Sequence, residues 1–216
     1  MNIGPEWLPG PGRPRPPTGQ NESALWMNAE LFARRVVLVS GVLDDAAAGE
    51  IAVQLMTLDA SGDDHITLQV NASGTNLQAA FTVMDTIDLL GVPVHALCVG
   101  RAEGPAVGVI AIAHQRRAAP HASFRLSPPR FESAGTASEV AEWSLHCQRQ
   151  FDRFCDRLAA ATGQSSGRIA DDLEASRTLS AREAVRYGLI DTIGHGGGHQ
   201  PPRSRPFGFQ VPPADL

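Results

Sequence analysis

The side chains that could support nucleophilic chemistry are serines and histidines spread over the whole sequence. They are Ser73, Ser127, Ser176, His65, His95, His114 and His121. A serine becomes a nucleophile when a neighbouring imidazole takes its proton. Nothing in the order of these residues pairs one hydroxyl with one imidazole, so we interpret each as an ordinary turn, strand or surface residue. Glu103 could serve as a general base, because a carboxylate in a pocket can accept a proton, or it is a solvated turn residue.

The charged residues exclude several kinds of chemistry. The chain of 216 residues carries 18 cationic side chains, all of them arginine, and 23 acidic ones, which gives a net charge of −5. Without lysine there is no phosphate-loop lysine, no Schiff base and no Ser-Lys pair. A nucleic-acid binder would carry a basic excess, so we expect no nucleic-acid partner. Asp171 and Asp172 are interpreted as charges on a helix surface.

The cysteines and the hydropathy indicate a reduced, cytoplasmic protein. Cys98 lies in an apolar run and Cys147 and Cys155 lie in a helical pattern, which favours packing over metal binding. An odd number of cysteines without paired spacing does not suit a disulfide framework. No apolar run reaches the roughly 18 residues that a membrane span needs, and prolines interrupt the segment where a signal peptide would be apolar. We expect no metal, no cofactor and no membrane.

Proline and glycine divide the chain into three parts. Many of the 16 prolines fall near the two ends. Residues 1–20 and 194–216 are therefore predicted to be disordered tails, because such segments cannot bury enough apolar surface to offset their ordering entropy. Residues 21–193 are predicted to form one folded domain.

Within this domain, buried strands alternate with helices. Strands are predicted at Val36 to Ser40, Ile66 to Val70 and Val94 to Val99, with helices that begin at Asp45, Thr75 and Pro105. This alternation is typical of an α/β layered fold.

Two further helices have clear start and stop signals. From Thr136, with Glu139 as a capping box, an apolar stripe continues for some 26 residues to Gly163. At about 1.5 Å per residue this helix is roughly 40 Å long, so we expect it to project and to pack against another subunit. Ser180 and Glu183 cap a second helix over Ala181 to Tyr187, which Gly188 ends.

Five segments in one order resemble the proteolytic subunit of the Clp protease, ClpP. They are LSAREAVRYGLID at 179–191, TGQS at 162–165, the strand at 35–41, the turn at 71–74 and the run at 98–100. ClpP is a serine peptidase that assembles as stacked rings beneath an AAA+ unfoldase. The resemblance implies a ClpP/crotonase-like α/β fold of stacked β-β-α units with a projecting long handle helix. It also implies a homo- or hetero-oligomeric ring with active Clp proteolytic subunits, and an AAA+ Clp unfoldase as a possible partner.

The catalytic triad of the resembled family is not kept. Its serine position falls on Gly104, its histidine position on Ser127 and its aspartate position on Ser176. In such a triad the imidazole takes the serine proton and the carboxylate holds the imidazole. None of these three catalytic side chains is present at its position in this chain.

The oxyanion positions implied by the resemblance are Gly74, Thr75 and Pro105. Proline has no N–H, so Pro105 cannot act as an oxyanion donor, although it suits the first turn of a helix. The resemblance therefore predicts a ClpP-like subunit without proteolytic activity.

Two alternatives remain open. The crotonase enzymes share the fold and bind acyl-CoA thioesters, and Glu103 could serve as their base. The second alternative is a regulator that competes with the unfoldase for docking, because Phe207-Gly208-Phe209 resembles the hydrophobic-Gly-hydrophobic docking loops of Clp unfoldases.

Overall fold

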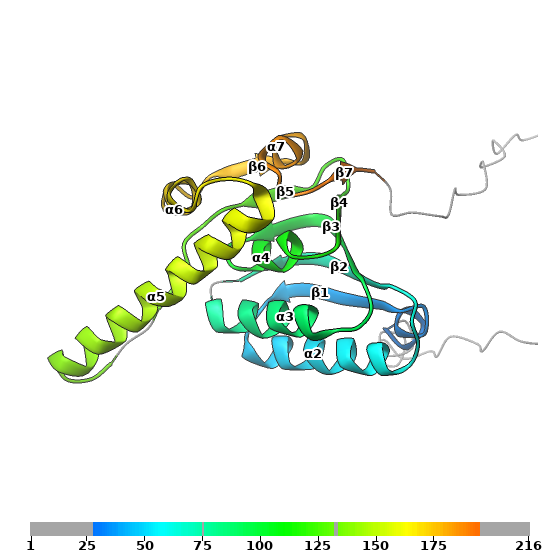
Figure 1. Ribbon diagram of the computed structural model, residues 1–216, viewed down its shortest axis with the longest axis horizontal. Coiled ribbons are helices and arrows are strands. Elements are labelled where there is room, and N and C mark those ends of the chain that lie inside the picture. Colours follow the sequence, from blue (N-terminus) through cyan, green and yellow to red (C-terminus); the bar gives the residue numbers. More distant parts are fainter. Residues whose placement is uncertain (1–27, 75, 132–133, 195–216) are drawn as a thin grey trace, which may run out of the picture.

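The computed structural model describes residues 28–194, with the exception of residues 75, 132 and 133. Both predicted tails lie almost entirely outside the described residues, and so does Thr75. The described part has the predicted α/β architecture, with a mostly parallel sheet, helices packed against it and one long helix that projects (Figure 1).

The central sheet has the strand order β1-β2-β3-β4-β7, and all of these neighbours pair in parallel. Its strands are β1 (Val36–Val42), β2 (Ile66–Ser73), β3 (Val94–Glu103), β4 (Gln115–Ala118) and β7 (Thr192–Ile193). The three predicted strands are confirmed, but each runs further than its apolar stretch. The added residues continue the ladder through polar and small side chains, for example Ser73 opposite Glu103. This extension carries β3 to the turn at Gly104.

Three helices follow the first three strands, as predicted. They are α2 (Asp45–Ala60), α3 (Leu77–Leu89) and α4 (Ala106–Ala111). Asp44 and Asn76 cap the first two with their side chains, so α3 begins two residues after the predicted start at Thr75. Pro105 stands at the N-cap of α4 with φ −55°, a value that its ring already imposes.

The long helix is α5 (Ala137–Thr162), which has the predicted 26 residues, the Thr136–Glu139 capping box and a left-handed Gly163 at its end. Its C-terminal half is fixed to the core by the fully buried Phe154 and Leu158. Its N-terminal half projects beyond the rest of the domain (Figure 1).

A smaller antiparallel unit completes the domain. It comprises β5 (Ser123–Arg125), α6 (Ser166–Glu174), β6 (Thr178–Ser180) and α7 (Ala181–Tyr187). The predicted capping box at Ser180 and the left-handed Gly188 are both present. β5 pairs in parallel with the end of β3 and antiparallel with β6, so this unit is joined to the sheet at the carboxyl end of β3.

The three cysteines are buried and unbonded, which confirms the packing interpretation. Among the described residues, no helix is both long and apolar enough to span a bilayer.

Candidate functional site

Strand pairing brings Gly104 and Ser127 into contact. β3 and β5 run in parallel with Glu103 opposite Arg125, and the N–H of Gly104 donates to the carbonyl of Arg125 at 2.9 Å. Two residues after Arg125, Ser127 Oγ lies 3.3 Å from the point where a Cβ on Gly104 would stand. The predicted nucleophile and histidine positions are therefore neighbours.

Ser176 reaches the same corner through the antiparallel pair of β5 and β6. Arg125 lies opposite Thr178, and the N–H of Leu126 donates to the carbonyl of Arg177 at 2.8 Å. Continued by two more residues, this register would place Ser176 opposite Ser127. Ser176 follows α6 and has a left-handed φ of 51°. Asn and Asp tolerate this conformation better than other side chains, so the backbone here would also accept an aspartate.

The main chain at the corner is tightly packed. Gly104 is buried with φ +59°, and a Cβ added to it would lie 2.2 Å from the carbonyl oxygen of Gly74. The N–H of Gly74 already donates to the carbonyl of Glu103 at 3.0 Å. Pro105 is buried and has no N–H. Gly74 and Pro105 are the predicted oxyanion positions that the structure describes. Neither has a free backbone N–H group that could donate to an oxyanion.

Glu103 lies beside this corner on the strand that precedes Gly104. Its side chain is half-buried, and Glu103 Oε1 lies 3.8 Å from Nη1 of Arg101. Ser73 is its backbone partner across β2 and β3. Glu103 therefore makes a weak ion pair with Arg101.

Three of the four candidate histidines lie away from this corner, and the fourth, His121, is exposed in the turn that precedes β5. His65 precedes β2, His95 lies at the start of β3 and His114 precedes β4, so all three lie at the amino ends of strands whose carboxyl ends lead to Gly104. The rings of His65 and His95 stack at 4.2 Å, and the N–H of Val94 donates to Nδ1 of His114 at 3.2 Å. Burial, together with His65, His114 and Arg117, lowers the pKa of His95. These imidazoles are too remote in the fold to act as a base at residue 104.

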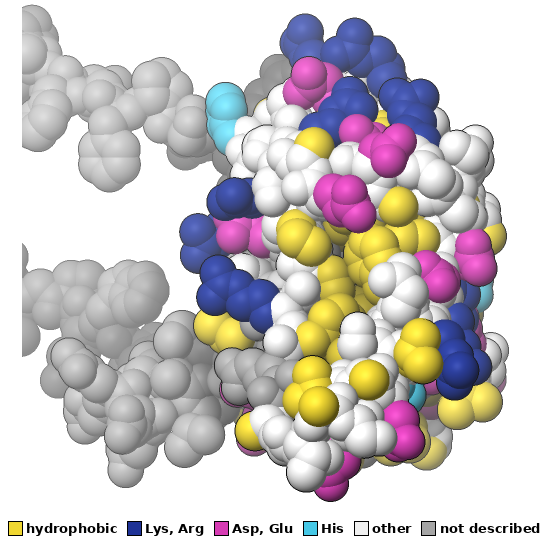
Figure 2. Space-filling model, turned by 90° about the vertical axis from the view of Figure 1, so that its left-hand side faces the viewer, with side chains coloured by type: hydrophobic (Ala, Val, Ile, Leu, Met, Phe, Trp, Pro, Cys, Tyr) yellow, Lys and Arg dark blue, Asp and Glu magenta, His cyan; other side chains and the backbone are white. Residues whose placement is uncertain are grey.

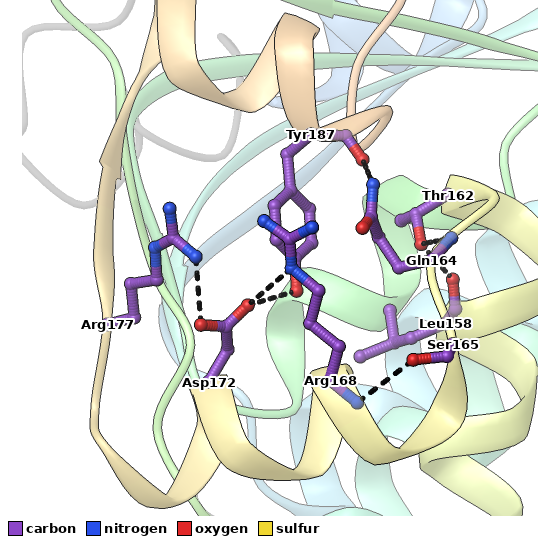
Figure 3. Close-up of polar contacts among 8 residues, drawn as sticks. All are labelled: Leu158, Thr162, Gln164, Ser165, Arg168, Asp172, Arg177 and Tyr187. Atoms are coloured by element: carbon purple, nitrogen blue, oxygen red, sulfur yellow. Dashed lines mark hydrogen bonds and ion pairs between the residues drawn. The ribbon is translucent and has the colours of Figure 1, made fainter.

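Asp172 is a residue whose role the sequence reasoning missed. Its interpretation as a helix-surface charge was wrong, because only 14% of its side chain is exposed. Asp172 Oδ2 accepts from the hydroxyl of Tyr187 at 2.7 Å, and Oδ1 accepts from Nη1 of Arg177 at 2.9 Å (Figure 3). Arg168 Nε lies 3.8 Å from the same carboxylate. The spacing of Arg168 and Asp172 by four residues was the one local signal for this cluster.

The cluster around Asp172 fixes the segment that carries Ser176. Both Arg168 and Arg177 lie 5.6 Å from the centroid of the Tyr187 ring, so the phenol is held between two guanidinium groups. Burial of Asp172 opposes ionisation, but the hydrogen bonds from Tyr187 and Arg177 and the charges of both arginines outweigh it and lower the pKa of Asp172. Burial and the hydrogen bond to Asp172 raise the pKa of Tyr187. These groups bind one another and leave no proton-transfer group free.

A hollow of about 480 Å³ lies beside the corner, between α3 and the outer half of α5. Its lining includes Asn76 and Phe81 from one side and Trp143 and His146 from the other. The rings of Trp143 and His146 stack at 5.3 Å. Such a surface could hold an apolar group. Cys147 also lines it, but burial raises the pKa of its thiol, and side chains at adjacent helix positions such as His146 and Cys147 do not face each other. The described part of the chain also contains no group of three or more side chains that could ligate a metal ion.

Comparison with known proteins identifies the family. A sequence model of the Clp protease family matches residues 19–196. The chain belongs to the Clp protease family. It is 31% identical over 170 residues to the ATP-dependent Clp protease proteolytic subunit 1 of Nocardia farcinica, which covers 76% of this chain and 85% of that protein. It is 30% identical over 168 residues to the subunit of the same name from Thermobifida fusca, with 76% of each chain covered.

Membership of the Clp protease family explains the architecture around the corner. The sheet, the projecting α5 and the antiparallel pair of β5 and β6 form a ClpP-like fold. The assignment of Gly104, Ser127 and Ser176 to the triad positions of the family remains a prediction.

Proposed function

We propose that this ClpP-like chain is a proteolytically inactive subunit of a Clp protease complex, with a structural or regulatory role in the ring. The observation that carries this proposal is the corner at Gly104. A residue without a side chain stands at the predicted nucleophile position and a serine stands at the predicted histidine position, so neither position supplies the nucleophile or the imidazole that a triad needs.

The expected loss of activity is very large. Removal of triad residues costs roughly a millionfold in rate, and the separate losses do not add, because the residues act as one unit. Removal of one oxyanion donor costs about 100- to 1000-fold. Pro105 supplies no such donor, and the N–H of Gly74 is already bonded to Glu103. Residual hydrolysis would therefore lie far below that of an active subunit.

The projecting half of α5 supports a role in assembly. Val140, Trp143 and Leu145 are partly exposed there, as is the nearby Phe131. Figure 2 faces the end of the molecule from which α5 projects, and hydrophobic side chains are visible there between charged ones. Exposed apolar surface on a rigid helix is typical of a protein–protein contact. We propose active Clp proteolytic subunits as the contacts, in the cytoplasm, with an AAA+ unfoldase as a further partner.

The experiment is native mass spectrometry of the chain alone and mixed with active Clp proteolytic subunits of its host. We expect mixed rings, and no peptide hydrolysis by the chain alone. Trp143→Ala should reduce incorporation without unfolding the chain, since Trp143 is 43% exposed. Thr57→Ala on α2 is the control, because Thr57 is exposed and lies away from α5. If the spectra of the mixture show the chain without any active subunit bound to it, the mixed ring is contradicted.

The two alternatives receive less support. An acyl-CoA site of the crotonase kind needs two free backbone N–H groups, whereas Pro105 has none and that of Gly74 is occupied. Calorimetry with acetyl-CoA should show no heat of binding. Phe207-Gly208-Phe209, on which the regulator hypothesis depends, lies outside the described residues, and deletion of residues 200–216 with an unfoldase competition assay tests it.

A further inference from the structure

A carbonyl group stands where a side chain at residue 104 would begin. The Cβ of any residue placed there would lie 2.2 Å from the carbonyl oxygen of Gly74, although real Cβ atoms essentially never approach another atom within 3.0 Å. Ser127 Oγ is the next atom, at 3.3 Å, and it belongs to a side chain that can turn away. The severe conflict is therefore with the main chain.

Hydrogen bonds hold the peptide unit that precedes this carbonyl. The N–H of Gly74 donates to the carbonyl of Glu103 at 3.0 Å, and the N–H of Leu43 donates to the carbonyl of Ser73 at 2.8 Å. On its other side Gly74 packs against α4, since a Cβ on Gly74 would lie 3.3 Å from the nitrogen of Ala106. These contacts fix the Cα of Gly74, so its carbonyl can leave residue 104 only by rotation about the Cα–C bond or by disruption of the end of the β2–β3 ladder.

Residue 104 is equally constrained. Its N–H donates to the carbonyl of Arg125 and its own carbonyl accepts from the N–H of Val107, so the strand before it and the helix after it both fix its position. Its φ of +59° adds the strain that any side chain has in the left-handed region.

We infer that the chain closes its own nucleophile position with main-chain atoms, so that residue 104 accepts glycine alone. This inference rests on the proposed inactivity and deepens it. Lost side chains can be restored by substitution, whereas a space filled by the backbone cannot be emptied in that way. Gly104→Ser combined with Ser127→His, Ser176→Asp and Pro105→Met should therefore give no peptidase activity, and robust hydrolysis by this variant would overturn the inference.

Matched glycine variants separate backbone strain from the contact with Gly74. Gly163 has φ +73° with nothing within 4 Å of an added Cβ, so Gly163→Ala reports strain alone. Gly188 has φ +84° and the same 2.2 Å conflict, here with the carbonyl of Thr162, so Gly188→Ala is the positive control. Overpacking should lower the folding equilibrium constant of Gly104→Ala about 10- to 100-fold more than that of Gly163→Ala. Urea unfolding measures this, and a difference below about tenfold would overturn the inference.

Two further measurements identify the main chain as the cause. The exchange rate of the Gly74 amide should rise in Gly104→Ala and stay unchanged in Gly163→Ala, because displacement of Gly74 from residue 104 strains the neighbouring bond to Glu103. The double variant Gly104→Ala with Ser127→Ala should be no more stable or soluble than Gly104→Ala, even if neither folds well. Rescue by Ser127→Ala would attribute the crowding to a side chain and refute the inference. Peptide hydrolysis by the unchanged chain would instead contradict the proposed function.

Discussion

The hydroxyl of Tyr187 should contribute substantially to stability, because it donates to a partly buried carboxylate. Tyr187→Phe removes the 2.7 Å bond to Asp172 Oδ2 and keeps the ring between Arg168 and Arg177. Hydrogen bonds to charged groups contribute about 1.5 to 3 kcal/mol. At about 2 to 4 °C per kcal/mol for a domain of this size, we expect the melting temperature to fall by about 3 to 12 °C.

A double-mutant cycle with Asp172→Asn tests whether the ionised carboxylate is the cause. A neutral acceptor makes a bond of only about 0.5 to 1.5 kcal/mol, so Tyr187→Phe should cost about 1 kcal/mol less in the Asp172→Asn background. The assay is urea unfolding at pH 7 and one protein concentration, because assembly shifts apparent stability. A coupling free energy below about 0.5 kcal/mol would refute the reasoning.

The same bond has a predictable pH dependence. The folded protein holds the pKa of Asp172 below its ordinary value of 3.8, because the hydrogen bonds and arginine charges outweigh burial. A carboxyl group with a lowered pKa adds stability above its unfolded pKa and loses it as the pH falls through the folded pKa. The cost of Tyr187→Phe should therefore be constant from pH 7 to about pH 5 and shrink below about pH 4. An undiminished cost at pH 3 would contradict this assignment.

Three further predictions concern the core, the thiols and the amino edge of the sheet. Phe154→Ala should cost about 3 to 5 kcal/mol in urea unfolding, because its fully buried ring anchors α5, whereas the exposed Trp143→Ala should cost about 0.5 kcal/mol or less. Burial raises the pKa of Cys98 to about 12, so iodoacetamide at pH 8 should label it only after unfolding, and rapid labelling of the native chain would contradict its burial. The pKa of His95 is lowered by burial and by its neighbours His65, His114 and Arg117. As the pH falls, the unfolded chain therefore binds a proton before the folded protein does, and the stability decreases below about pH 6.5. His95→Gln should flatten this fall between pH 7 and pH 5 in thermal unfolding, and an unchanged slope would exclude His95 as its source.

The sequence predicted those parts of the fold that depend on residues close together in the chain. The ends of α5 and α7 were predicted correctly, because capping boxes and left-handed glycines act within one helical turn. β5 and β6 were missed, because strands of three residues have no measurable periodicity. Asp172 was misinterpreted because its partner Tyr187 lies on another helix. Strand ends were predicted too early, because hydrogen bonding continues beyond the apolar residues.

The candidate site was likewise predicted only in part. The resemblance named Gly104, Ser127 and Ser176; the structure places Ser127 beside Gly104, and the register of β5 and β6 leads toward Ser176. The contact between the Gly74 carbonyl and residue 104 had no sequence signal, since it joins the ends of two different strands through main-chain atoms. Thr75, the remaining predicted oxyanion position, lies outside the described residues.

The backbone at residue 104 connects the proposed inactivity to stability. A serine held at φ +59° would store about 1 to 2 kcal/mol of strain, which glycine does not have. Strain of this kind is found at catalytic turns, where it is tolerated for the sake of activity. If the proposed inactivity holds, a strained serine beside Pro105 would confer no benefit, and glycine is the residue that makes this turn more stable. Glycine then lets the Gly74 carbonyl approach closely, and that approach excludes every other side chain.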